Sequence, residues 1–254
     1  MNLVDIIKYL ESLFPKENAY DWDNVGIQVG TLNIEAKRVL VTLDVTKEVV
    51  KEAIDKKVNM IISHHPLLFN PLDKIIFDTP RGWIIKNLVK HNITVYSAHT
   101  NYDTTDGGMN DEFSNLLEMK NVKLLDEIDK IGRYGTIEKM HIIDFISFLK
   151  DKLDIESVKV IGNDDKIVET VGISGGSGSK HMYQAKMRGC NCYLTGDITY
   201  HTALDAVGMG ITLIDIGHYA EKIFVKAIIR ILSQQFKEVQ FLASEVDTNP
   251  YKNY

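Results

Sequence analysis

Residues 59–66 read Asn-Met-Ile-Ile-Ser-His-His-Pro, an apolar run that ends in two adjacent histidines and a proline. The run predicts a short buried strand, and Pro66 disfavours helical geometry at His65, so the chain stays extended there. Because successive side chains of an extended chain point to opposite sides, His64 and His65 suit two neighbouring ions better than one. Such strand ends are where ligands bind in open α/β sheets. Two solvated or hydrogen-bonded loop histidines are the competing interpretation.

The segments around this run predict a parallel β-α-β arrangement. Residues 38–44 predict a buried strand, and residues 46–57 predict a helix that is capped by its first threonine. A second helix over 80–91 precedes a strand over 93–98. Alternation of this kind is typical of a parallel sheet covered by helices. The last strand runs into residues 99–103, His-Thr-Asn-Tyr-Asp, so polar side chains again follow a strand end.

Two polar loops of this half each have two interpretations. Asp21, Asp23 and Asn24 could line a site, but an ordinary turn with side-chain hydrogen bonds to the backbone is the favoured prediction. Gly107 and Gly108 open a predicted helix that reaches about residue 118. Phosphate binding at that helix start and a plain turn with an N-cap explain the pair equally well.

The second half of the chain predicts three more strands, over 168–174, 190–195 and 211–216, with helices between them, and then a last strand over 239–242. Residues 175–180, Gly-Gly-Ser-Gly-Ser-Lys, follow the first of these strands but match neither nucleotide-binding glycine pattern. They predict a strand-to-helix turn that lets a ligand approach the backbone closely. Polar residues follow the other two strand ends, from Asp197 and from His218 onward.

The two halves match each other without gaps. A shift of 132 residues places 39–42 on 171–174 and 59–65 on 191–197, and a shift of 118 places 93–98 on 211–216. We therefore predict an α/β fold of two similar lobes related by internal duplication, with a metal cleft between them. The predicted boundaries are 1–125 for the first lobe, 126–166 for a connecting segment with a surface histidine, His141, and 167–254 for the second lobe. We expect the two lobes to be interlinked in one compact unit.

Five side chains at these strand ends predict a metal site: His64, His65, Asp103, His218 and Glu221. Imidazoles and carboxylates suit Zn, Fe, Mn or Ni, and five ligands exceed what one tetrahedral site uses. We therefore expect two divalent metal ions per chain, roughly 3.5–4 Å apart and bridged by a carboxylate and a water or hydroxide. Such ions lower the pKa of bound water towards ~7 and supply a nucleophile.

Three further polar residues are candidate catalytic residues near this site: Asp197, His201 and His99. Each could orient a ligand or transfer a proton. For each one taken alone, a purely structural role is the competing interpretation.

Composition restricts the partners. The 254 residues are 44% hydrophobic and 25% charged, with a net charge of −6, so nucleic-acid binding is not indicated without a local basic patch. No apolar run approaches the ~20 residues of a membrane span, and no signal peptide is indicated at the start. Cys190 and Cys192 suit neither a long-loop disulfide nor a redox motif, so we expect a cytoplasmic protein.

Several motifs together resemble those of the GTP cyclohydrolase I type 2 homologue family, which is also named for Ngg-interacting factor three. They are Trp22-Asp23-Asn24-Val25-Gly26, Ser63-His64-His65-Pro66, Ser97-Ala98-His99-Thr100-Asn101-Tyr102-Asp103, Thr195-Gly196-Asp197 with Tyr200-His201, and Asp215-x-Gly217-His218-x-x-Glu221. The motifs occur in the family's order and span nearly the whole chain.

The resemblance implies two α/β lobes with paired metal ions, and a toroidal homohexamer built as a trimer of dimers. Carried over by motif, the ligands are again His64, His65, Asp103, His218 and Glu221. Some members space the last pair by four residues, but Lys222 occupies that place here, which leaves Glu221. Some relatives also carry an inserted domain, for which residues 121–166 are too short.

Three functions follow from these patterns. We expect a dinuclear metal-dependent hydrolase, in which metal-bound hydroxide attacks a small heterocyclic or nucleotide-like substrate. The alternative is a ring-shaped binding or regulatory protein that contacts nucleic acid or a partner protein and carries structural metals. A metal-handling protein is the third hypothesis.

Overall fold

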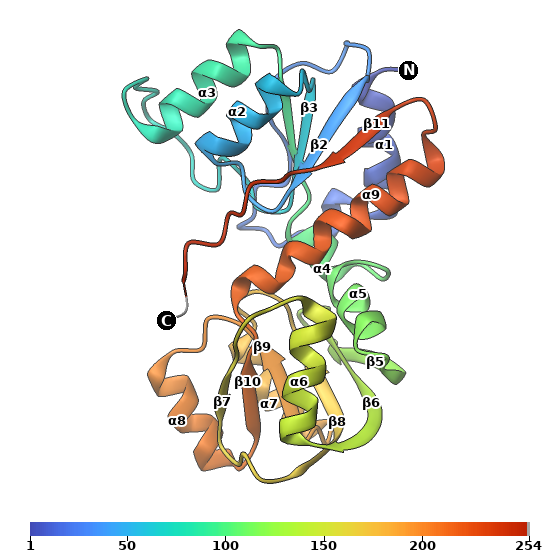
Figure 1. Ribbon diagram of the computed structural model, residues 1–254, viewed down its shortest axis with the longest axis vertical. Coiled ribbons are helices and arrows are strands. Elements are labelled where there is room, and N and C mark those ends of the chain that lie inside the picture. The colour runs from blue at the N-terminus through green and yellow to red at the C-terminus, as the bar shows by residue number, and fades with distance from the viewer. Residues whose placement is uncertain (253–254) are drawn as a thin grey trace. The chain divides into compact units, whose positions relative to one another are not determined.

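The computed structural model describes residues 1–252, and the chain divides into two compact units (Figure 1). The first unit comprises residues 1–105 and 224–250, and the second comprises residues 106–223 and the chain from Tyr251. Each unit is built around one β-sheet with helices against it. The predicted α/β fold class is therefore confirmed.

The first unit contains a five-stranded sheet in the order β1–β4–β3–β2–β11. The strands span Gly26–Val29, Thr94–Ser97, Met60–Ser63, Arg38–Thr42 and Gln240–Ala243 in that order. Strands β4, β3, β2 and β11 run parallel, and β1 pairs with β4 in the antiparallel direction. The central strands are buried on both faces, which explains their nearly continuous apolar sequences.

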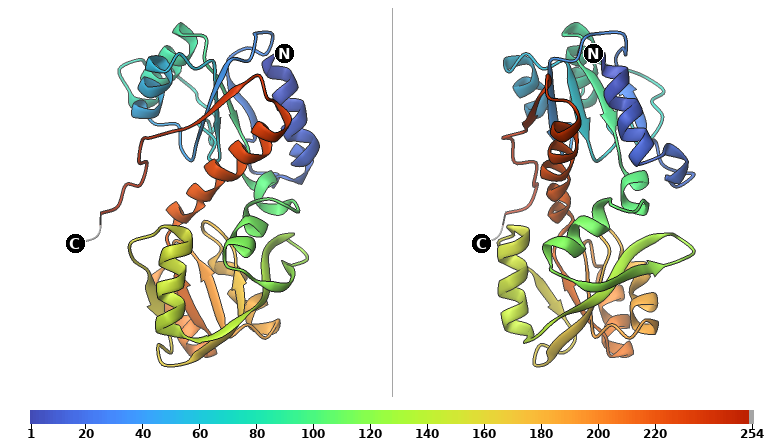
Figure 2. Two further views of the ribbon diagram at one scale, coloured as in Figure 1. Left: turned by 45° about the vertical axis from the view of Figure 1, so that its right-hand side comes forward. Right: turned by 90° about the vertical axis from the view of Figure 1, so that its right-hand side faces the viewer.

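Helices cover both faces of this first sheet (Figure 2). Helices α2 (Lys47–Asp55) and α3 (Pro80–Lys90) bury apolar side chains against one face, together with Leu40, Ile61 and Val95. Helices α1 (Leu3–Leu13) and α9 (Ile223–Gln235) lie on the other face, where Tyr9 packs edge-on against Phe236. The short elements η1 (Lys16–Asn18) and α4 (Thr100–Thr104) complete the unit.

The second unit contains a six-stranded sheet in the order β5–β6–β8–β9–β10–β7. The strands span Lys120–Asp126, Ile131–His141, Ile167–Ile173, Cys192–Thr195, Thr212–Asp215 and Lys159–Ile161. Strands β8, β9 and β10 are parallel, and the other three pair in the antiparallel direction.

Helices also cover both faces of the second sheet. Helices α5 (Met109–Leu116) and α6 (Ile142–Leu153) pack on β6 and β8, whereas α7 (Met182–Met187) and α8 (Tyr200–Met209) bury the opposite face (Figure 2). Two 3₁₀ turns, η2 (Ser179–His181) and η3 (His218–Lys222), follow strand ends. Helix α6 buries Ile142, Phe145, Leu149 and Leu153, which are spaced as on one face of a helix.

Within each of the two sheets, the parallel strands pair in an equivalent register. The register pairs are Val39–Met60 and Met60–Thr94 in the first sheet, and Val171–Cys192 and Cys192–Thr212 in the second. These are the pairs that the sequence shifts of 132 and 118 residues bring together. In both sheets an antiparallel strand, β1 or β7, borders the third strand. The register match supports internal duplication, which itself stays a prediction.

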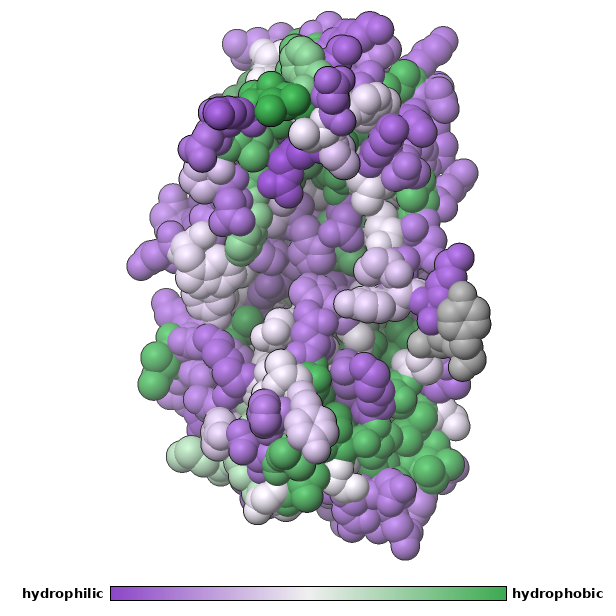
Figure 3. Space-filling model, turned by 90° about the vertical axis from the view of Figure 1, so that its left-hand side faces the viewer, coloured by the Kyte–Doolittle hydropathy of each residue, from purple (hydrophilic) through white to green (hydrophobic). Residues whose placement is uncertain are grey.

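Among residues 1–252, no helix is both long enough and apolar enough to cross a membrane. The surface in Figure 3 is mostly hydrophilic, and hydrophobic side chains gather in patches on it.

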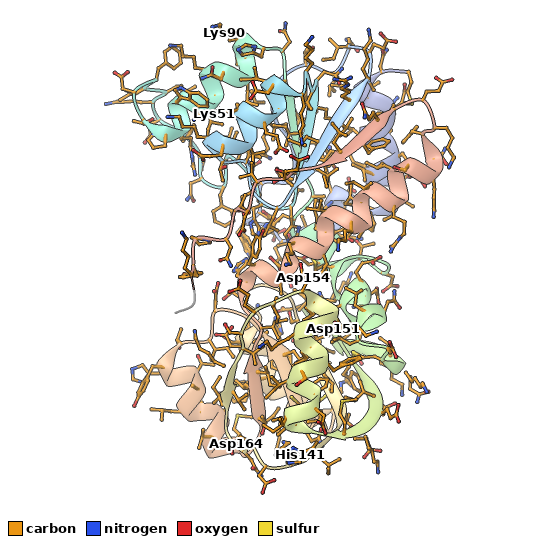
Figure 4. All side chains as sticks on the ribbon, viewed as in Figure 1. Lys51, Lys90, His141, Asp151, Asp154 and Asp164 are labelled. Atoms are coloured by element: carbon orange, nitrogen blue, oxygen red, sulfur yellow. The ribbon has the colours of Figure 1, made fainter. Side chains whose placement is uncertain are left out.

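The division into units differs from the predicted boundaries. Residues 126–166 do not connect two lobes but form β6, α6 and β7 of the second unit, whereas 224–250 return to the first sheet. The exposed residues of β5 hide its strand pattern, and the pairing of β11 with β2 joins segments about 200 residues apart. His141 is a surface residue that caps α6 and bonds Asp165, beside the labelled Asp164 in Figure 4.

The buried His181 makes the stability of the second unit pH-dependent. Burial lowers the pKa of His181 below 6.5, although its Nδ1 lies 3.0 Å from Asp126 Oδ2. The unfolded chain therefore binds a proton more readily, and stability is lost as the pH falls through about 6.5. In urea titrations of metal-free protein, we expect His181→Gln to reduce the decline in unfolding free energy between pH 7.5 and 5.5. The reduction should reach at most about 1.4 kcal/mol per pH unit.

The matched control is His141→Gln, which makes the same change at the surface. If both variants decline with pH as steeply as the wild-type protein, burial of His181 is not the cause.

Candidate metal centre

Polar side chains follow the carboxyl ends of three parallel strands in the first unit. Asp44 follows β2, His64 and His65 follow β3, and His99 follows β4. Because the strands are parallel, these ends lie at one edge of the sheet. One nitrogen each of His64, His65 and His99 lie within 4.8 Å of one another, close enough to hold a metal ion.

The three imidazoles share one hydrogen-bonding arrangement. His64 Nδ1 lies 2.8 Å from the Ala98 carbonyl, His65 Nδ1 lies 2.7 Å from Asp44 Oδ1, and His99 Nδ1 lies 2.9 Å from Asp23 Oδ1. Carbonyl and carboxylate oxygens only accept, so each Nδ1 carries the proton and Nε2 carries the lone pair of the neutral ring. Histidines that bind metals are oriented in this way.

Asp103 adds a carboxylate to this group. Helix α4, which the sequence did not predict, begins directly after His99 and places Asp103 four residues further on. The Asp103 backbone N–H donates to the His99 carbonyl, and Asp103 Oδ1 lies 3.6 Å from His64 Nε2. The structure thus brings together three of the predicted residues, His64, His65 and Asp103, with His99 beside them.

Two carboxylates that the sequence did not predict as site residues, Asp23 and Asp44, hold the imidazoles. Burial raises the pKa of Asp23, but hydrogen bonds from His99 and Thr100 outweigh it, and the pKa falls below 3.8. The pKa of Asp44 is lowered in the same way, against burial, chiefly by the hydrogen bond from His65. Both groups are therefore anionic at neutral pH. Their charge favours an N–H at Nδ1 and a cation nearby.

The sequence contained a signal for Asp44 but not for the role of Asp23. Asp44 follows a predicted strand, so the strand-end rule that selected His64 also applies to it. Asp23 bonds a histidine 76 residues away, and no local pattern predicts that contact.

In the second unit, His218 and Glu221 lie on one side of η3. Side chains three residues apart eclipse in a 3₁₀ turn, and His218 Nε2 lies 3.2 Å from Glu221 Oε2. His218 Nδ1 lies 2.6 Å from Asp197 Oδ2, so His218 repeats the arrangement of the other three imidazoles. Asp197 has a φ of 52°, which is rare for a residue other than glycine and is typical of functional sites.

The glycine turn after β8 makes room for the Glu221 carboxylate. A Cβ at Gly176 would lie 2.7 Å from Glu221 Oε1, and one at Gly175 would lie 3.0 Å from the same oxygen. A Cβ at Gly196 would lie 2.7 Å from the His218 backbone nitrogen. The group that approaches this turn is thus a side chain of the protein itself.

His201 is exposed near the start of α8, and its ring contacts that of Tyr200 edge-on, with the ring centroids 5.7 Å apart. Its predicted catalytic role stays a prediction.

A separate group, Asp126, Asp129 and His181, also has metal-ligand spacing. The Lys180 ammonium lies 2.6 Å from Asp129 Oδ2 and already supplies a positive charge there. This group is therefore a poorer candidate than the strand-end histidines.

The fold and these donors define a class of protein: α/β proteins with histidine and carboxylate donors, suited to Zn, Fe, Mn or Ni, at the ends of parallel strands. The chain belongs to the Duf34/NIF3 (NGG1p interacting factor 3) family, whose profile matches residues 1–250. The family resemblance seen in the sequence motifs is thereby confirmed.

Individual relatives match over their full length. The GTP cyclohydrolase 1 type 2 homolog of Streptococcus pneumoniae is 36% identical over 97% of this chain and 97% of the relative. The crystal structure of a Bacillus cereus protein related to NIF3 matches with a TM-score of 0.95 and 27% identity, over 100% and 99% of the two chains. Reduced HcgD from Methanocaldococcus jannaschii matches with a TM-score of 0.85 and 28% identity, over 97% and 98%.

The glycine turn yields a test of the Glu221 position. We expect Gly176→Ala to weaken Mn²⁺ or Zn²⁺ binding about 10-fold, because the new Cβ displaces the Glu221 carboxylate. The measurement is a competition titration with a chelator. Gly189→Ala is the matched control, since Gly189 also has a positive φ but an added Cβ there meets nothing within 4 Å. Equal affinities in the two variants would contradict a role of Glu221 in metal binding.

Proposed function

We propose that this protein is a dinuclear metal-dependent hydrolase that acts on a small heterocyclic or nucleotide-like substrate. The observation that carries the proposal is the common orientation of four histidines, His64, His65, His99 and His218. In each one, Nδ1 faces an oxygen acceptor and Nε2 carries the lone pair. A random set of surface histidines has no reason to share this arrangement.

The number of donors supports two ions rather than one. The first unit offers His64, His65, His99 and Asp103, and we propose that His218 and Glu221 of the second unit bind to the same pair of ions. Six nitrogen and oxygen donors exceed the four of a single tetrahedral site. A pair of divalent ions supplies a nucleophile by lowering the pKa of water, and it polarises the bond to be cleaved.

The protein's own residues prepare this site before any ion binds. Asp44 and Asp23 fix the orientation of His65 and His99, and Asp197 does the same for His218. Asp197 is in this view a positioning residue. The negative charges of the buried Asp23 and the half-buried Asp44 also favour a divalent cation over a neutral ligand.

The names of relatives suggest the first substrate to test. The Streptococcus pneumoniae relative is called a GTP cyclohydrolase 1 type 2 homolog, and we propose a purine nucleotide as the first compound to examine. We also propose a cytoplasmic location. Cys190 and Cys192 are buried free thiols, and burial raises the pKa of Cys190 to about 12, as expected for inert cysteines of a reducing compartment.

One surface feature supports the assembly of several copies of the chain. Tyr200, Leu204 and Val207 are exposed and share one face of α8, and Figure 3 shows hydrophobic side chains gathered on the side of the second unit that bears this helix. We propose that this face contacts a second copy of the chain. Assembly into the homohexamer that the motifs imply is compatible with catalysis and with partner binding.

Metal content is the direct test of the site. We expect gently purified protein to contain close to two transition-metal ions per chain, and His65→Ala and Glu221→Ala each to lower that content sharply. Elemental analysis measures it, and His141→Ala is the control histidine variant. Wild-type protein that is metal-free and cannot be reloaded would contradict the proposal.

Two variants separate the hydrolase from the binding protein. Asp103→Ala should abolish GTP turnover, because it removes a carboxylate beside His64, and should leave the sedimentation coefficient unchanged. Leu204→Asp should reduce the sedimentation coefficient by placing a charge on the exposed face of α8. Turnover that is equal in wild-type protein and Asp103→Ala, with a salt-dependent gel shift of DNA, would favour the binding protein.

A further inference from the structure

Three aromatic side chains lie together on the first unit, two of them exposed and the third, Tyr20, half-buried. Trp22 is 58% exposed and Phe69 is 43% exposed, and their ring centroids lie 5.8 Å apart. Tyr20 packs at 5.5 Å from Trp22. We call Tyr20, Trp22 and Phe69 the aromatic face. Exposed aromatic side chains in contact with one another are typical of a surface that binds something.

Hydrogen bonds hold the aromatic face in place. Asn24 Nδ2 donates to the Leu68 carbonyl at 2.6 Å, the Leu68 N–H donates to Gln28 Oε1 at 3.0 Å, and Gln28 Nε2 donates to the Asn24 carbonyl at 2.7 Å. This closed set joins the segment that carries Trp22 to the segment that carries Phe69. The two rings therefore sit on a fixed frame, so binding would cost little ordering of loops.

The aromatic face borders the candidate metal centre. The ring of His99 lies 6.2 Å from Trp22 and 6.3 Å from Phe69, in edge-on geometry. Asp23, the residue after Trp22, is the acceptor for His99 Nδ1. A ligand on the aromatic face therefore lies next to one of the metal-donor histidines.

We propose that the aromatic face stacks a planar heteroaromatic ring, such as a purine or pterin, and holds it beside His99. This inference rests on the proposed function, which assigns the role of the metal site. It adds that the aromatic face selects the substrate. Aromatic side chains stack on any nucleobase because every base has a π-face.

Tryptophan fluorescence tests the contact directly. The chain has two tryptophans, Trp22 and Trp83, so Trp83→Phe leaves Trp22 as the only reporter. We expect guanosine to quench the emission of this variant and ribose to leave it unchanged. Emission that guanosine does not alter would overturn the proposal. Emission that changes with protein concentration instead would assign the face to a second copy and would also overturn it.

Affinity measurements separate stacking from general packing. In equilibrium dialysis, Trp22→Leu should weaken guanosine binding about 5- to 100-fold, because leucine has no π-face, whereas Trp22→Phe should retain most of it. Phe77→Leu is the matched control, since Phe77 is 52% exposed and is not part of the aromatic face. Wild-type affinity in Trp22→Leu would overturn the proposal.

The same samples distinguish this proposal from the proposed function. We expect Trp22→Leu to retain the wild-type metal content. If protein loaded with metal binds no guanosine, the stacking proposal fails and the metal site stands. If guanosine binds with the expected dependence on Trp22 but no metal can be loaded, the hydrolase proposal fails and the aromatic face stands.

Discussion

Parallel strands must end at the same edge of their sheet, and the candidate donors of this protein follow from that constraint. In the first unit, β2, β3 and β4 run directly into Asp44, the histidine pair and His99. In the second unit, β9 leads to Asp197 and β10 to His218. The parallel strands also pair in an equivalent register within each sheet. One geometric rule, used twice, thus collects histidines and carboxylates from segments that are far apart in the sequence.

Hydrogen bonds at Nδ1 orient these histidines as candidate metal donors. An imidazole can bind an ion through either nitrogen, and its choice depends on what the other nitrogen contacts. Asp23 is kept ionised although its side chain is buried, and Asp44 although it is half-buried, because the hydrogen bonds that they accept outweigh the cost of burial. The same carboxylates fix the rings and attract a cation. The site is therefore organised by the protein rather than by the ion.

Much of the fold and of the candidate site was predictable from local sequence patterns. The remaining features depend on contacts between segments that are distant in the sequence. Continuous apolar runs predicted the central strands, and the strand-end rule predicted His64, His65 and His218. The sequence carries no clear signal for strand β5, because its first residues are exposed and show no apolar alternation. Asp23 bonds His99 across 76 residues, and a polar loop of this kind favours the prediction of a plain turn. The glycine turn was predicted to admit a ligand, but only the structure shows that Glu221 lies against it.

Asp23 links the two binding features of the first unit. Its side chain is fully buried and accepts hydrogen bonds from His99 and from the backbone and hydroxyl of Thr100, so it cannot move without breaking several contacts. Its neighbour Trp22 is exposed and carries the aromatic face. A rigid residue between them keeps the distance between a stacked ring and His99 nearly constant. Such a frame favours ligands of one shape over flexible ones, because a ring that fits needs no rearrangement of the protein. Selectivity for planar substrates would then follow from the same hydrogen bonds that orient the metal donor.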